Sequence, residues 1–183
     1  MGPRTRYNQS MSAVVRPLPA PLEPGARVGV MAPAGPCDPA AVRSGLEFLR
    51  VHGFEAVPAP NLASRTAYVA GSDEERLAGI LALLDGGVEA LVAARGGYGV
   101  MRLLSRMPWQ RLAAWKGWVV GFSDMTALHA GLATRFPRAT LHGPMVTSLG
   151  RPGRAAHPIP ANTGASRPFA NRRNCARRAG SPS

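Results

Sequence analysis

Apolar positions along the chain fall into two kinds of pattern, short continuous runs and longer stretches with helical spacing. The short runs favour strands over 26–32, 54–57, 88–94 and 117–121, and a fifth strand begins at 140 and breaks at Gly143-Pro144. The helical stretches cover 38–53, 72–87, 100–107, 109–115 and 124–135. Because strands and helices alternate, we expect an α/β domain, a flavodoxin-like parallel sheet flanked by helices.

Residues that start helices support two of these assignments. Asp38 followed by Pro39 is typical of an N-cap and a first helical position. Ser72 and Glu75 have the spacing of a capping box. The buried stripe of the helix that follows Ser72 is expected at Leu77, Ile80, Leu81 and Leu84.

Composition divides the chain into three parts. Residues 1–24 are polar and then rich in proline, which favours a flexible lead. Residues 25–150 form the predicted domain. Residues 151–183 contain seven arginines, no acidic residue and no strand or helix period, which predicts a basic disordered tail. The mixture of Arg, Ala, Pro, Gly and Ser in this tail is also what a shifted reading frame of GC-rich DNA produces, so a frameshift is a second hypothesis.

The net charge of +12 comes in large part from that tail. A basic surface attracts nucleic acid, but no recognition motif accompanies the charge, so we expect no specific nucleic-acid partner. No apolar stretch is long enough for a membrane span and none resembles a secretory signal, which favours a cytoplasmic protein. The two cysteines, Cys37 and Cys175, lie far apart without a cluster of ligands, so neither a disulfide framework nor a metal site is expected.

Three glycines in five positions follow the strand at 88–94, in the segment Arg95-Gly96-Gly97-Tyr98-Gly99. Such a turn allows close approach of a bound group, and its amides can donate to an anion. It matches neither a Walker loop nor the dinucleotide spacing. The other interpretation is a tight connection between strand and helix.

A second turn, Gly121-Phe122-Ser123-Asp124, lies between the strand at 117–121 and a helix. This is the arrangement of a nucleophile elbow, which exposes a serine hydroxyl at the edge of a sheet near the first amides of the helix. The glycine expected after the aspartate is missing, and a helix cap is the alternative. Both turns follow parallel strands, so they are predicted at the same sheet edge.

Four segments in this order and at these distances, VGVMAPAGP, ARGGYGVMRLL, VVGFSDMTALH and TLHGPM, resemble one family. They are similar to the N-terminal domain of the LD-carboxypeptidases, the murein tetrapeptide carboxypeptidases, a group that includes the microcin-immunity peptidases. The resemblance covers roughly 27–149, and we assign 25–150 to this domain.

The resemblance implies a serine-type carboxypeptidase that removes a terminal D-alanine from muropeptides during cytoplasmic recycling of the cell wall. Ser123 would be the nucleophile, and the amides of Asp124, Gly97 and Gly96 would form the oxyanion hole. Residues expected to contact the muropeptide are Arg95, Tyr98 and His142. The resemblance implies no metal and no cofactor.

The chain departs from the family in one respect, because the family's general-base histidine and its glutamate partner belong to a second domain. The tail has one histidine, His157, and no acid. His129 is expected to pack on its helix or face solvent, and His142 would need Ser123 within hydrogen-bond reach and an acid behind it. We therefore expect a truncated or frameshifted product that is weakly active or inactive alone.

Three alternatives follow from the resemblance and from this departure. The first is hydrolysis of the microcin-immunity type, which uses the same nucleophile. The second is a non-catalytic remnant that binds muropeptide. The third concerns assembly: a domain without its partner exposes an apolar face, so a homodimer is expected as one outcome.

Overall fold

The computed structural model describes residues 16–150. Predictions that concern 1–15 and 151–183, among them the disordered tail, its possible change of reading frame and His157, lie outside the described residues. The boundaries of the three predicted parts stay a prediction for the same reason.

The sheet has five parallel strands in the order β2-β1-β3-β4-β5, which is the flavodoxin-like order that the sequence predicts. Each strand lies within or close to a predicted range. The bounds are β1 (Arg27–Met31), β2 (Glu55–Pro58), β3 (Ala90–Ala93), β4 (Trp118–Gly121) and β5 (Leu141–His142).

Helices connect the strands and cover both faces of the sheet. Their bounds are α1 (Pro39–Val51), α2 (Asp73–Asp85), α3 (Val100–Leu103), α4 (Trp109–Ala114), α5 (Thr126–Arg135) and α6 (Val146–Leu149), with a 3₁₀ turn η1 (Ser123–Met125) before α5. The expected caps are confirmed, because the Asp38 side chain accepts from the amide of Ala41 and Ser72 forms a reciprocal capping box with Glu75.

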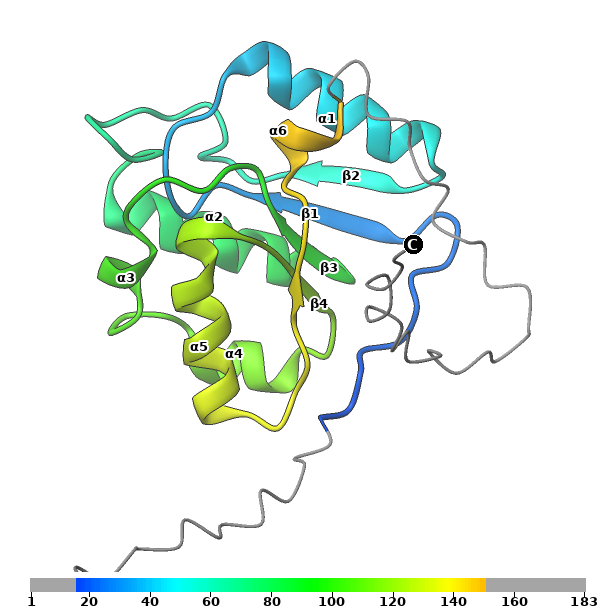
Figure 1. The fold of residues 1–183 in the computed structure, drawn as a ribbon, viewed down its shortest axis with the longest axis vertical. Helices are drawn as coiled ribbons and strands as arrows, with labels where there is room; N and C mark the ends of the chain where they lie inside the picture. Colours follow the sequence, from blue (N-terminus) through cyan, green and yellow to red (C-terminus); the bar gives the residue numbers. More distant parts are fainter. Residues whose placement is uncertain (1–15, 151–183) are drawn as a thin grey trace, which may run out of the picture.

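Two cores lie on opposite faces of the sheet, with α1 and α6 on one side and α2 to α5 on the other (Figure 1). Side chains alternate between them along each strand: in β3, Leu91 contributes to the core under α2 to α5 and Val92 to the core under α1 and α6. Both faces of the central strands are therefore apolar, as the continuous apolar run predicts.

Several element boundaries differ from the prediction. The helix expected over 100–107 ends at Leu103, and the chain turns at 104–106. Of the expected buried stripe of α2, Leu77, Ile80 and Leu84 are buried and Leu81 is only half-buried. Leu83, which was not expected in the stripe, is buried as well. The sequence pattern did not predict α6, a four-residue helix that packs closely on α1 at Gly45.

Residues 16–24 form no helix or strand but hydrogen bond to the domain. The Arg16 guanidinium donates to the carbonyl of Phe136 over 2.9 Å, and the indole N–H of Trp118 donates to the carbonyl of Ala20 over 2.7 Å. This part of the expected flexible lead is therefore attached to the domain at its β4–β5 side.

Candidate active site at the carboxyl edge of the sheet

The loops that follow β1, β3 and β4 meet at the carboxyl edge of the sheet. The chain reverses its direction of winding between β1 and β3, since α1 covers one face and α3 the other. The loops at this point are joined by a hydrogen bond from the amide of Gly35 to the carbonyl of Gly96, 3.1 Å long. Open α/β sheets bind ligands in the crevice at such a switch point.

Ser123 stands at this edge with an unusual backbone. It follows β4 directly, its side chain is exposed, and its φ is +61°, one of two positive values at non-glycine residues among residues 16–150. A left-handed serine costs about 1–2 kcal/mol. A strained serine between a strand and a helix is the geometry of a nucleophile elbow. The hydroxyl makes no hydrogen bond to any residue within 16–150.

The glycine turn touches this serine. A Cβ added to Gly96 would lie 2.9 Å from the Cβ of Ser123 and 3.0 Å from its Oγ, so only glycine allows the two backbones to approach this closely. Gly97 has a φ of +122°, which also favours glycine. The two turns that the sequence places at one edge are thus in direct contact.

Amides near the hydroxyl are free to donate. Within the described residues, the N–H groups of Gly96 and Gly97 donate to no protein acceptor. Asp124 lies in the first turn of η1, where an amide has no partner within the helix. Three backbone donors on the two turns are therefore available to a negative charge that forms beside Ser123.

The side chain of Asp124 links the two turns. Its Oδ2 accepts from the amide of Val100, the first residue of α3, over 2.9 Å. This bond satisfies the start of α3, whose N-cap, Gly99, has no side chain to do so.

Arg95 and Tyr98 flank the glycines and are both exposed. One terminal nitrogen of Arg95 donates to the carbonyl of Pro36 over 2.8 Å, which places the guanidinium over the loop that follows β1. Burial raises the pKa of the Cys37 thiol in that loop, and the charge of Arg95 opposes the shift. Cys37 is therefore held as a thiol rather than as a reactive thiolate.

Neither described histidine at this end of the sheet bonds to Ser123. The Nε2 of His129 lies 2.9 Å from the carbonyl of Gly121 and donates to it. Burial lowers the pKa of His129, so the ring stays neutral, and its buried Nδ1 has no hydrogen-bond partner among the described residues. The exposed ring of His142 lies 6.2 Å from that of His129 and 6.2 Å from that of Phe122.

The two turns therefore bring an exposed serine hydroxyl next to backbone amides without protein acceptors, and no histidine among the described residues bonds to that hydroxyl. Within 16–150 no cluster of three or more His, Cys, Asp and Glu side chains is arranged to hold a metal ion.

Met145 is a contact at this site that sequence reasoning missed. Its side chain is buried, and its Cε would lie 3.5 Å from a Cβ on Gly96. The signal was its position, because it directly follows the Gly-Pro pair that ends β5, and residues after the strands of this sheet converge on one edge.

Comparison with known proteins points to one family for this domain. Residues 28–143 match the family model described as the LD-carboxypeptidase N-terminal domain. A protein of Streptomyces coelicolor named as a carboxypeptidase is 44% identical over 144 residues, which cover 76% of this chain and 46% of that protein. The murein tetrapeptide carboxypeptidase of Pseudomonas aeruginosa is 34% identical over 126 residues, covering 68% of this chain and 41% of that protein.

A solved structure of the microcin C7 self-immunity protein superposes with a TM-score of 0.69 at 27% identity, and the match covers 73% of this chain and 42% of that one. No helix in the part of the chain that the structure describes is both long and apolar enough to cross a bilayer. The chain spans less than half the length of the curated relatives that it matches. The family model covers most of the described domain, and the chain therefore belongs to the LD-carboxypeptidase family.

Proposed function

We propose that this chain carries the nucleophile of a serine carboxypeptidase that removes a terminal D-alanine from murein peptides. The observation that supports this most strongly is the exposed, left-handed Ser123 in contact with Gly96. Its hydroxyl attacks the carbonyl of the last peptide bond. The amides of Asp124, Gly97 and Gly96 receive the charge of the resulting oxyanion.

The same edge supplies side chains for substrate binding. Murein peptides are acidic, and the exposed guanidinium of Arg95 retains donors that Pro36 does not use, so it pairs with a substrate carboxylate. Tyr98, in the glycine turn after β3, and His142, the last residue of β5, are both exposed and complete the proposed contacts. Calorimetry with a murein tetrapeptide is expected to show weaker binding by Arg95→Ala.

The proton of Ser123 needs an acceptor that the described residues do not place beside it. His129 donates its Nε2–H to a backbone carbonyl, and no acid orients either His129 or His142 toward the serine. The family resemblance implies a histidine and a glutamate from a second domain for this role, which stays a prediction. Serine hydrolases without a working triad lose about 10⁴- to 10⁶-fold in rate.

The test uses added imidazole as the missing base. The purified chain is incubated with murein tetrapeptide, and free D-alanine is measured with and without imidazole. We expect slow release that imidazole accelerates, and no release above background by Ser123→Ala. Ser105→Ala removes an exposed serine with ordinary backbone geometry and should behave like the wild type. Release that persists in Ser123→Ala would overturn the assignment of the nucleophile.

Hydrolysis of a microcin conjugate is the second candidate, favoured by the structural likeness to the microcin C7 self-immunity protein. It uses the same nucleophile, so Ser123→Ala does not separate the two. A parallel assay with a microcin conjugate and with murein tetrapeptide separates the two activities. Only the true substrate class should release a product at a rate that imidazole increases. A chain that binds the tetrapeptide but never releases D-alanine, even with imidazole, would be the non-catalytic binding module.

A further inference from the structure

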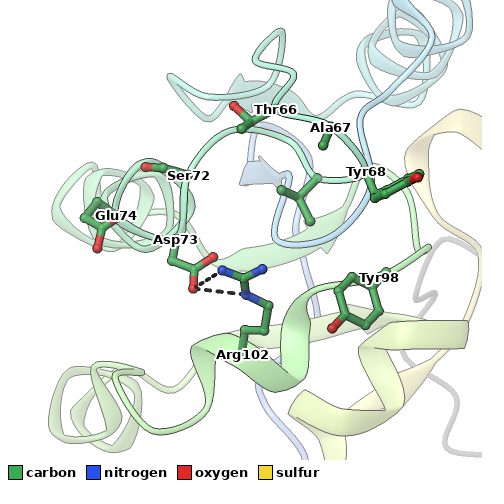
Figure 2. A pocket seen from close by; sticks show the side chains of 9 residues that line it. Thr66, Ala67, Tyr68, Ser72, Asp73, Glu74, Tyr98 and Arg102 are labelled. Atoms are coloured by element: carbon green, nitrogen blue, oxygen red, sulfur yellow. Dashed lines mark hydrogen bonds and ion pairs between the residues drawn. The ribbon is translucent and has the colours of Figure 1, made fainter.

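A hollow of about 400 Å³ lies beside the glycine turn (Figure 2). Its walls are the turn at 66–69, the first residues of α2, and Tyr98 with Arg102 of α3. Ser123 is not among its lining residues, whereas Tyr98 belongs both to this hollow and to the glycine turn. A volume of this size suits one small ring or a short side chain.

Two tyrosines from different loops line the hollow with strongly exposed rings. Tyr68 is 83% exposed and Tyr98 is 60% exposed. Figure 2 shows both rings on one side of the hollow, opposite Ser72 and Glu74 of α2. Large aromatic side chains left in water on two adjoining loops are typical of a binding surface.

The backbone holds each ring in this position. Tyr68 lies at the tip of a tight turn closed by two hydrogen bonds between Thr66 and Val69, 2.9 and 3.1 Å long, and the preceding Ala67 has a φ of +50°. Tyr98 stands between Gly97 at +122° and Gly99 at +120°. The left-handed backbone of Ala67 is strained for a residue with a Cβ, and strain of this kind concentrates at functional sites.

The two carboxylates that line the hollow are both paired with arginines. Asp73 pairs with Arg102 over 3.2 Å, as Figure 2 shows, and also with the buried Arg76. Glu74 pairs with Arg106 over 2.6 Å, and this pairing lowers the pKa of the Glu74 carboxyl. The paired carboxylates can still accept hydrogen bonds, but both carboxylates that line the hollow are already paired, so neither offers a free charge to a cation. Aromatic faces with neutral hydrogen-bonding capacity suit a sugar ring.

We propose that this hollow is a saccharide subsite that binds the sugar carried by a murein peptide. The inference rests on the proposed function. It adds that the sugar end of the substrate lies in the hollow while the terminal D-alanine lies at Ser123. Gly96 contacts Ser123, and the two residues to Tyr98 span about 7 Å at most. The three residues that precede the terminal D-alanine of a tetrapeptide span about 10 Å when extended. A sugar at their far end therefore reaches the tyrosines while the last peptide bond lies at Ser123.

Calorimetry on the full chain tests this with two ligands, a muramoyl tetrapeptide and the same tetrapeptide without sugar. All proteins carry Ser123→Ala so that neither ligand is cleaved. We expect the muramoyl ligand to bind about five- to tenfold more tightly, the effect of one or two aromatic contacts. Tyr68→Ala should abolish this difference and leave the affinity for the free peptide unchanged.

Two control variants accompany this measurement. Tyr68→Phe keeps the ring and should retain most of the preference for the sugar. Met101→Ala changes another exposed apolar side chain, 72% exposed, that does not line the hollow, and should retain all of it. Equal affinities for the two ligands, equal losses for both in Tyr68→Ala, or no binding of either ligand would each overturn the proposal. Release of D-alanine that depends on Ser123 would leave the proposed function standing in all three cases.

Discussion

At the scale of single residues, Ser123 and Gly96 define the site. Their close contact restricts which side chains either position can hold. Ser123 has a left-handed backbone, and its Cβ and Oγ fill the space that a side chain on Gly96 would need. This pair places an exposed hydroxyl against a turn of free amides. The strain at Ser123 contributes nothing to packing, which is why it indicates function.

Substitution at Ser123 should show that strain directly. Ser123→Ala keeps a Cβ in a left-handed conformation, whereas Ser123→Gly releases it. We expect the glycine variant to be more stable than the alanine variant by about 1 kcal/mol in urea denaturation. Ser105 has no positive φ and serves as the control. Here we expect Ser105→Gly to be less stable than Ser105→Ala by about 0.5–1 kcal/mol. The same order at both positions would contradict a strained serine.

Short elements carry the site at the next scale. The turn η1 and the four-residue α3 lie side by side, and the carboxylate of Asp124 joins them by accepting from Val100. Gly99 offers no cap to α3, so this bond supplies an acceptor that the glycine turn needs. A residue of the serine turn therefore holds the end of the glycine turn where α3 begins.

Removal of that carboxylate should loosen α3. Asp124→Ala leaves the amide of Val100 without an acceptor, and we expect a loss of about 1–2 kcal/mol in the free energy of unfolding. Asp124→Asn keeps an acceptor oxygen and should lose less. Hydrogen exchange followed by NMR gives the local readout, with the Val100 amide exchanging faster in the alanine variant. Unchanged exchange at Val100 would show that the bond does not hold α3.

The accuracy of sequence reasoning also differs between elements. Apolar runs and caps predicted β1, β3, α1 and α2 well, since buried strands and capped helices depend on local residues. Local pattern did not predict α6, because its four residues are helical through packing on α1 at Gly45. The bond from Asp124 to α3 joins segments 24 residues apart and has no local signal. The hollow lined by Tyr68 and Tyr98 depends on such long-range placement as well.

At the scale of the whole molecule, the buried Arg76 connects three separate segments. It belongs to α2, donates to the carbonyl of Pro33 after β1 and to that of Gly99 before α3, and pairs with Asp73. The loops at the switch point and the glycine turn are thus fixed to one guanidinium. Since its side chain has no exposure to water, all of these bonds form in the interior.

Two arginines that share Asp73 provide a matched pair of variants. Arg76→Met leaves the carbonyls of Pro33 and Gly99 without their donor and takes the buried partner from Asp73, and we expect a loss of about 3–5 kcal/mol in the free energy of unfolding. Arg102→Met removes a partner that is 55% exposed and should cost less than about 1 kcal/mol. Urea denaturation of both compares them directly. Equal losses would mean that burial of Arg76 is not what makes its ion pair important.

The strand order determines when the central strands of the sheet can pair during synthesis. β1 is made first, yet one of its two neighbours is β3, and Val28 pairs with Ala90. Until the ribosome has added the residues of β3, the nascent chain holds only the strands β1 and β2 with the helices α1 and α2. Pairing between strands this far apart in the sequence slows folding. Until β3 pairs with β1, the apolar residues of β1 stay accessible to chaperones.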